Sequence, residues 1–357
     1  MRRGENIYKR SDGRWEGRYI ASRNVSGKAQ YRSVYAHTYL EVREKLRVAP
    51  KESTKSKMTL FPNIAEKWLC SVKLRCKTST YNKYYSQYTN HLLPAFEKSH
   101  IADISNLRIE EMFSEKTDIS EKTKADILSI IRQILKYAQG IGIVIDPTAQ
   151  DISIRQQRKD VRVLTSSEQK LLEEYLLLEA DLTRLGTYLV LYTGLRIGEL
   201  CALKRENIDF KKRVIHVGAT MQRLRVEGAA SKTEVMLTEP KSKCSIRDIP
   251  ISKPLMKLFQ KYYYNIEPDC FILTGSDKFI EPRLLNYRFR QYIADCELSD
   301  VHFHTLRHSF ATRCIERGVD VKSLSEILGH YDVNITLNRY VHPSLELKRS
   351  SMEKLHF

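Results

Sequence analysis

The sequence predicts a mainly α-helical protein with small β-sheets, organised in three parts, and three observations lead to this prediction. The chain has 357 residues, which is more than one ordinary core holds and enough for two or three domains. Polar connectors at 50–57 and 146–163 interrupt its apolar pattern. Outside them most apolar residues recur at helical spacing, and strand-like patterns are confined to short runs. We therefore expect domains over 1–50, 58–145 and 161–357.

The first fifty residues predict a small sheet followed by a helix. Strand-like runs cover Asn6–Arg10 and Arg14–Ala21, and the sequence Ser-Asp-Gly between them is a hairpin signal. Gln30–Tyr35 is a third candidate strand, and Thr38–Val48 carries residues that favour a helix.

These strands carry several arginines among aromatic residues. A basic, aromatic sheet can lie in a DNA groove, and Arg14, Arg18 and Arg32 are then candidate DNA-binding residues. The alternative is that the aromatic residues form the core of the small sheet. The segment alone does not decide between the two interpretations.

Residues 58–145 predict a compact helical domain. Glu121–Gln139 has one apolar stripe, and Gly140 supplies the expected stop. Thr78–Leu93 is a second helix, rich in tyrosine, which we expect to end at Pro94. That helix carries three further candidate DNA contacts, although its tyrosines equally suit a core position: Lys83, Tyr84 and Tyr88.

The last part mixes helices with a few strands. A capping box at Thr165–Glu168 predicts the start of a helix. Helical signals follow at Leu171–Leu178, Arg184–Tyr192, Gly198–Leu203, Leu284–Cys296, Leu306–Arg317, Val321–Leu328 and Asn334–Val341. Strand signals lie at Val214–Val217, Ile246–Ile251 and Phe271–Leu273. Lys241 stands just before the second of these strands, at an expected hairpin.

The charge of the chain indicates a polyanionic partner. Lys and Arg outnumber Asp and Glu by 60 to 43, a formal net charge of +17, so nucleic acid is the first candidate and a basic solvated surface is the alternative. We expect no secretory signal and no membrane span, and seven scattered cysteines suit a reduced, cytoplasmic protein. No phosphate loop, dinucleotide motif, zinc spacing or acidic metal cluster is evident, so we expect no cofactor and no metal.

Four segments of the last part carry residues suited to phosphate chemistry. They are 193–200 with Arg196, 240–247 with Lys241, 304–308 with His304 and Arg307, and 328–330 with His330, followed ten residues later by Tyr340. Taken singly, each arginine, lysine or histidine is more often a surface residue, and a tyrosine is more often a core residue. Their occurrence together, in this order, favours a shared site.

This order resembles the tyrosine recombinase (phage integrase) family, whose pattern is Arg, Lys, His-x-x-Arg, His and Tyr. The neighbouring residues are also typical of it: Thr-Gly-Leu-Arg-x-x-Glu-Leu, His-x-Leu-Arg-His and Leu-Gly-His. These motifs cover roughly 163–345. The helical domain resembles the family's core-binding, SAM-like domain more loosely. The first fifty residues resemble the arm-binding sheet of integrases from conjugative transposons and temperate phages.

The resemblance implies a role for each residue. Arg196 and Arg307 would clamp the phosphate, and His330 would hydrogen-bond one of its oxygens. Tyr340 would attack phosphorus, leaving a 3′-phosphotyrosyl link, with His304 as the family's candidate base. Lys241 would protonate the leaving 5′-oxygen, unless Lys243, two residues away, does so. Glu199 would orient its neighbours.

The resemblance also implies an assembly. Two larger domains would clamp double-stranded DNA, and a homotetramer would hold two DNA sites, with core-type and arm-type sequences bound by different domains. A directionality factor and a host DNA-bending protein would be further partners. The expected function is the integration and excision of a mobile element or prophage in a bacterial cytoplasm, with the protein on the nucleoid when bound.

Three alternatives remain at this point. A type IB topoisomerase shares the nucleophile, but the extra amino-terminal domain argues against it. A catalytically silent DNA-binding protein is disfavoured by the intact set from Arg196 to Tyr340. A dimer-resolving recombinase usually lacks the amino-terminal sheet.

Overall fold

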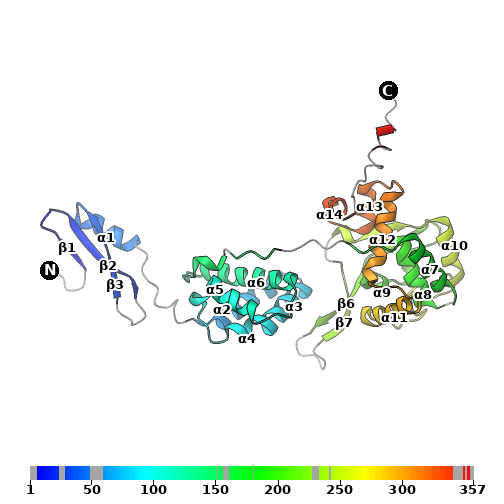
Figure 1. Ribbon diagram of the computed structural model, residues 1–357, viewed down its shortest axis with the longest axis horizontal. Helices are drawn as coiled ribbons and strands as arrows, with labels where there is room; N and C mark the ends of the chain where they lie inside the picture. Colours follow the sequence, from blue (N-terminus) through cyan, green and yellow to red (C-terminus); the bar gives the residue numbers. More distant parts are fainter. Residues whose placement is uncertain are drawn as a thin grey trace. The chain divides into compact units, whose positions relative to one another are not determined.

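The protein is mainly helical with small sheets, as predicted (Figure 1). The computed structural model describes residues 6–23, 29–48, 59–150, 152–155, 161–179, 181–226, 233–240, 243–340, 349 and 352–353. The chain divides into two compact units, Met1–Gln157 and Arg158–Phe357, and each part is described by itself. Across these described ranges, no helix combines the length and the apolar character needed to span a membrane.

An antiparallel sheet of three strands and one helix form the beginning of the chain. The sheet has the order β1 (Ile7–Lys9), β2 (Trp15–Arg23), β3 (Ala29–Ala36), and α1 (Tyr39–Val48) packs on it. The contact is close because Gly17 of β2 has no side chain: a Cβ there would lie 2.5 Å from the side chain of Val42. Each of the two interpretations holds for some of the aromatic residues: some form the core of the small sheet, and others lie on its surface. Trp15 packs edge-on against Tyr39 of α1, whereas Tyr31 and Tyr35 are exposed.

A helical bundle follows, and it encloses its own apolar core. Its elements are α2 (Phe61–Arg75), α3 (Thr78–Gln87), η2 (Tyr88–Leu92), α4 (Leu93–Phe96), η3 (Ile101–Asp103), α5 (Asn106–Ser114), α6 (Glu121–Gly140) and η4 (Pro147–Gln150). The apolar stripe of α6 is buried against α2, with Ile131 and Ile134 at 0% exposure and Trp68 at 1%. The side chain of Ser120 caps the start of α6 by accepting from the Thr123 N–H.

One prediction for this bundle is wrong. The tyrosine-rich helix does not end at Pro94, because it widens into a π-helical turn at η2 and Pro94 then occupies the first turn of α4, where a missing N–H is tolerated. Of the two alternatives for Tyr88, the structure shows the core position, because the side chain is 3% exposed there. Tyr84 is half-buried and stacks on Trp68, while Lys83 is exposed and pairs with Asp126 at 2.9 Å.

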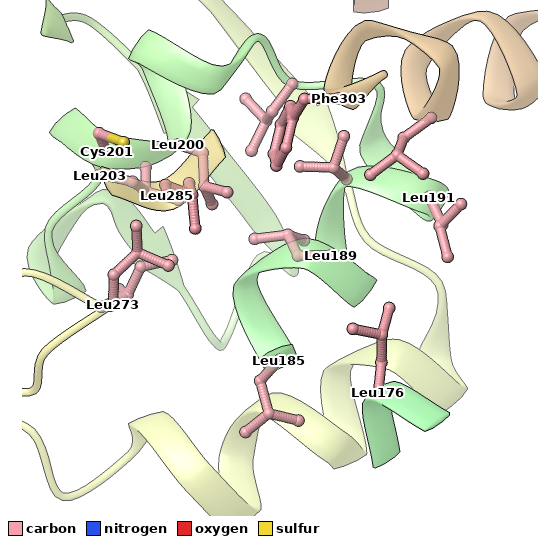
Figure 2. Close-up of a cluster of buried hydrophobic side chains, with 14 of the residues drawn as sticks. Leu176, Leu185, Leu189, Leu191, Leu200, Cys201, Leu203, Leu273, Leu285 and Phe303 are labelled. Atoms are coloured by element: carbon pink, nitrogen blue, oxygen red, sulfur yellow. The ribbon is translucent and has the colours of Figure 1, made fainter. Parts of the chain in front are cut away.

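The carboxyl-terminal unit gathers its helices around one large core. The elements are α7 (Ser166–Leu177), α8 (Leu182–Thr193), α9 (Ile197–Ala202), η5 (Arg205–Asn207), β4 (Ile208–Asp209), β5 (Val214–Val217), β6 (Thr220–Arg225), β7 (Thr233–Thr238), η6 (Lys243–Ser245), β8 (Arg247–Pro250), α10 (Lys253–Tyr263), α11 (Pro282–Asp295), α12 (Phe303–Glu316), α13 (Val321–Leu328) and α14 (Val333–Tyr340). Figure 2 shows Leu185 and Leu189 of α8, Leu200 of α9, Leu285 of α11 and Phe303 of α12 in this core. The predicted capping box at the start of α7 is present, with both reciprocal hydrogen bonds.

The strands of this unit pair differently from the prediction. The described strands form a sheet of order β4-β5-β8 and a separate ribbon of β6 and β7. The described strands that flank the expected hairpin do not pair with each other: β7 pairs with β6, and β8 pairs with β5. Phe271–Leu273 is a buried turn rather than a strand, held by an isolated bridge to Lys204 and by the Ile272 N–H donating to the Leu203 carbonyl.

Helix α12 brings the distant segments together. It contacts α8, α13 and α14, and its Ser309 hydroxyl accepts a hydrogen bond from the Leu164 N–H at 2.9 Å. The chain turns at the end of α8 through Gly194, whose φ of +64° suits glycine. A Cβ at this glycine would lie 2.7 Å from the Phe310 ring and 2.8 Å from Leu328. The turn before α9 therefore lies directly against α12 and α13.

Candidate active site

Arg196 stands at the start of α9 and is held by Glu199. Its Nη1 donates to Glu199 Oε1 at 2.7 Å, and its backbone N–H donates to the other carboxylate oxygen at 2.9 Å. Its Nη2 lies 3.4 Å from the Gly329 carbonyl oxygen, at the end of α13. The side chain keeps 37% of its surface exposed. One face of this guanidinium therefore stays open to a ligand.

Glu199 is shared by a second arginine, Arg247 of β8. Both terminal nitrogens of Arg247 donate to the Glu199 carboxylate, at 3.1 and 2.9 Å, and both side chains are buried. Arg247 Nε also donates to the Ile327 carbonyl at 2.5 Å. Burial alone would raise the pKa of Glu199, but the hydrogen bonds and charge of Arg247, with the charge of Arg196, lower it to about 2. The carboxylate therefore stays ionised and ties β8 to α9 and α13.

Arg307 lies in the interior of the unit at 1% exposure. Its Nη1 donates to the Gly194 carbonyl and its Nη2 to the Leu328 carbonyl, both at 2.7 Å. Burial and then the charge of Arg196 lower the pKa of Arg307 to about 9, so it remains charged at neutral pH. Arg196 and Arg307 thus both reach the carboxyl end of α13, at consecutive carbonyls.

His330 follows α13 and faces the same guanidinium. Its Nε2 lies 3.0 Å from Arg307 Nη2, and its Nδ1 lies 2.8 Å from the Thr336 hydroxyl. Because a guanidinium only donates, Nε2 must be an acceptor and Nδ1 carries the proton. Burial and then Arg307 lower the pKa of His330 to about 3, in agreement with a neutral ring.

Two histidines one turn apart stand on α12 beside Arg307. The rings of His304 and His308 meet edge to face, with centroids 4.4 Å apart. His304 is exposed overall, but its ring is partly desolvated. This desolvation and then the charge of Arg307 lower the pKa of His304. His308 is half-buried, and burial followed by His304 lowers its pKa to about 3.

Tyr340 ends α14 and is 5% exposed. Its ring packs with Ala311, Leu324 and Leu328 between α12 and α13. Its hydroxyl lies 2.7 Å from His308 Nδ1. Burial raises the pKa of Tyr340, against the opposing charges of Arg307, Arg339 and Arg196. The tyrosine is therefore a protonated phenol held within the same cluster of cations.

The other predicted site residues do not belong to the described part of this cluster. Lys241 lies outside the described residues, and so does Val341. Arg14, Arg18 and Arg32 are exposed on the amino-terminal sheet. Arg18 pairs there with Glu16, which is only 2% exposed, so this arginine also has a structural partner. Among the described residues, no group of three His, Cys, Asp or Glu side chains is arranged to hold a metal ion.

Two residues of this cluster, Arg247 and His308, were not predicted as site residues, although each has a weak signal in the sequence. Arg247 shares one face of its strand with buried Ile249, which is an unusual position for an arginine. His308 follows His304 by four residues, so a helix presents both on one side.

The arrangement suits an anionic group that gains charge during a reaction. It offers two guanidiniums, a neutral histidine and a tyrosine hydroxyl within one set of contacts. The model of the phage integrase family matches residues 162–346 and therefore includes every residue of this cluster. The chain belongs to the phage integrase family. A model of the phage integrase N-terminal SAM-like domain also matches residues 60–117, in the helical bundle.

Relatives of this family member are themselves recombinases and integrases. It is 25% identical over 315 residues to a tyrosine recombinase XerC-like protein of Caldanaerobacter subterraneus, covering 81% of each chain. It is 24% identical over 332 residues to the ICEBs1 integrase of Bacillus subtilis, covering 88% of each. The predicted resemblance is confirmed, and the chain is a tyrosine site-specific recombinase.

Solved structures of the family share its fold. The Tn1549 transposon integrase, in complex with a circular intermediate DNA, has a TM-score of 0.68 and 20% identity, covering 82% of this chain and 99% of that one. A lambda integrase dimer bound to a COC′ core site has a TM-score of 0.60 and 15% identity, covering 96% of each chain.

Proposed function

We propose that this recombinase is the integrase of a mobile element or prophage, which cuts and rejoins DNA through a 3′-phosphotyrosyl link to Tyr340. The observation that carries the proposal is the convergence of Arg196 and Arg307 on the end of α13, in the cluster that contains the Tyr340 hydroxyl. Fixed cations at that place stabilise a phosphate as it gains charge, without a metal ion.

The reaction has two balanced steps. The Tyr340 oxygen bonds to phosphorus, the bond from phosphorus to the 5′-oxygen breaks, and that oxygen takes a proton from Lys241 or Lys243. Rejoining reverses these changes with a new 5′-hydroxyl as the nucleophile. Because the phosphotyrosyl link conserves the bond energy, no nucleotide is consumed. His330 would hydrogen-bond a phosphate oxygen, and His304 is the base that the family resemblance assigns.

The partners follow from the relatives and from the surface of the chain. The Tn1549 integrase in a DNA complex and a lambda integrase tetramer on a Holliday junction support duplex DNA as substrate and a tetramer on two sites. We propose that the helical bundle and the catalytic unit clamp core-type DNA. The exposed arginines of the amino-terminal sheet would bind arm-type DNA. A directionality factor and a DNA-bending protein would assist.

The ICEBs1 integrase relative and the amino-terminal sheet favour a mobile element over a housekeeping recombinase. We propose that arm binding, core binding and catalysis belong to domains with the limits 1–50, 58–145 and 161–357.

The test is a denaturing gel of protein incubated with nicked duplexes drawn from the DNA that flanks its gene. Wild type should give a slow, protease-sensitive band, and Tyr340→Phe should give none while binding the DNA equally well, because only the attacking oxygen is lost. Tyr331→Phe is the matched control, since Tyr331 is 75% exposed, and it should cut normally. Cutting by Y340F would show that the nucleophile is wrong. Native-gel shifts without any adduct from wild type would favour a silent DNA-binding protein.

A further inference from the structure

We propose that His308, and not His304, receives the proton of the Tyr340 hydroxyl when that oxygen attacks phosphorus. The inference rests on the proposed role of Tyr340 as the nucleophile, and it deepens that role by assigning the catalytic base. His308 is thereby a catalytic residue, because it touches the reacting oxygen.

His308 Nδ1 lies 2.7 Å from the Tyr340 hydroxyl oxygen, within the range in which a base takes a proton directly. The ring centroids of the two residues are 5.6 Å apart, and Tyr340 is buried in one cluster with Ala311 of α12 and Leu328 of α13. The contact is therefore held by a packed interior and does not depend on a surface rotamer.

In the described part of the chain, no hydrogen bond joins His304 to Tyr340. The ring of His304 instead meets the ring of His308 edge to face, with centroids 4.4 Å apart. His304 is also exposed, which suits a residue that meets DNA.

The direction of the hydrogen bond between Tyr340 and His308 also suits a base. The charged or titratable groups that face His308 are His304, Arg339, Arg307, His330 and Tyr340. Burial and this mostly cationic neighbourhood keep the imidazole neutral, and burial keeps Tyr340 a phenol. The phenol then donates to an unprotonated Nδ1, and the proton of the ring is on Nε2. The opposite arrangement would leave the phenol proton without a partner among the contacts described.

The proton transfer changes the charge of the site during the step. The Tyr340 oxygen bonds to phosphorus while its proton moves to His308 Nδ1, and the 5′-oxygen leaves with a proton from the lysine. An imidazolium among several arginines is unfavourable in the empty site. A bound phosphate supplies the missing negative charge, so the transfer becomes favourable only when DNA is in place. Rejoining returns the proton to Tyr340.

The experiment compares H308N and H304N in single-turnover cleavage of a nicked duplex by the full-length protein. Asparagine places an amide near the position of Nδ1, so it keeps a hydrogen-bonding group but cannot accept the proton. We expect H308N to bind DNA as wild type does and to cut at least about 100-fold more slowly. H304N should lose less. Thermal unfolding checks the fold of each, and H308Q, whose longer side chain fills more of the ring's volume, replaces H308N if that variant does not fold.

Two further measurements separate a base from a structural residue. Replacing the leaving 5′-oxygen by sulfur removes the need for a proton donor, because a thiol is far more acidic than an alcohol. This substrate should rescue whichever lysine variant, Lys241→Ala or Lys243→Ala, cuts the ordinary substrate slowly, and it should not rescue H308N. The deficit of H308N should also shrink at high pH, once the pH passes the pKa of the Tyr340 phenol, which burial raises above the ordinary value of about 10.

The outcomes are distinct. If the wild type forms the adduct and H308N cuts DNA as fast or faster, the inference is wrong. It is also wrong if the sulfur substrate rescues H308N, or if the pH profile of H308N runs parallel to that of the wild type. A larger loss in H304N than in H308N returns the role to His304. Failure of the wild type to form any adduct would instead refute the proposed function.

Discussion

One buried carboxylate, Glu199, serves two arginines, and its removal should cost stability. Glu199→Gln keeps the shape of the side chain but leaves the Arg247 guanidinium buried without a counter-charge. Losing one partner of such a pair typically costs about 3 kcal/mol in the free energy of unfolding. We expect urea denaturation of E199Q to show a loss of that size for the carboxyl-terminal unit. Glu326→Gln, at an exposed carboxylate on α13, is the control and should change little.

The ion pair of Glu199 with Arg247 should make the free energy of unfolding depend on pH in the acid range. The pKa of Glu199 is lowered from 4.5 to about 2, so its contribution is fully present above pH 4.5 and disappears as the pH falls toward 2. E199Q has no such contribution to lose, and its unfolding free energy should fall less steeply in that range. Equal acid dependence in the two proteins, or equal stability at neutral pH, would mean that the pair is not stabilising.

Single residues show which parts of the candidate site a local sequence pattern can predict. Arg196, Arg307 and Tyr340 stand within recognisable local sequence, so each can be located without coordinates. His308 and Arg247 gain their importance from partners 32 and 48 residues away, and no local pattern displays such contacts. A pattern can therefore name candidate reactive groups and still omit the residues that contact them.

At the scale of elements, the turn between α8 and α9 should affect both the stability of the protein and its rate of DNA cleavage. Gly194→Ala puts a methyl group on a backbone with φ +64° and within 2.8 Å of Phe310 and Leu328. Its carbonyl also accepts from Arg307. We expect a loss of about 1–3 kcal/mol in stability and a fall in cleavage rate that exceeds the fall in DNA affinity.

Gly140→Ala is the matched control for that change, because a Cβ there meets nothing within 4 Å and helix α6 should gain slightly from alanine. Unfolding curves and single-turnover rates measure both variants. A G194A protein with wild-type stability and rate would show that the turn is not a constraint.

Elements with strong periodicity were predictable, and those defined by long-range pairing were not. Helix α13 has the predicted bounds and α6 differs by one residue, because caps and apolar stripes are local. The ribbon of β6 and β7 was missed, since each strand exists only by pairing with the other. Phe271–Leu273 looked like a strand because a short apolar run does not distinguish a strand from a buried turn.

At the scale of the whole molecule, the parts of the chain have separate cores. The core of the bundle starts at Phe61, and the cores of the carboxyl-terminal unit start at Leu164. No residue of the amino-terminal sheet belongs to these described clusters. The length and the polar connectors predict a multidomain chain and the charge predicts a polyanionic partner, but neither contains the arrangement of the domains.

Deletion of residues 1–57 should therefore separate two DNA-binding activities. The truncated protein keeps both larger cores, so we expect it to fold and to form the tyrosyl adduct on core-type DNA at a rate within about threefold of wild type. It should lose binding to a second, arm-type sequence, which competition gel shifts measure. In the full chain, Arg14→Ala with Arg32→Ala removes two exposed cations without touching a core residue. That variant should lower the slope of log affinity against log salt by about 2 for arm DNA alone. If the truncated protein still binds both sequences with full affinity, the amino-terminal sheet has another role, and the division into core and arm binding is wrong.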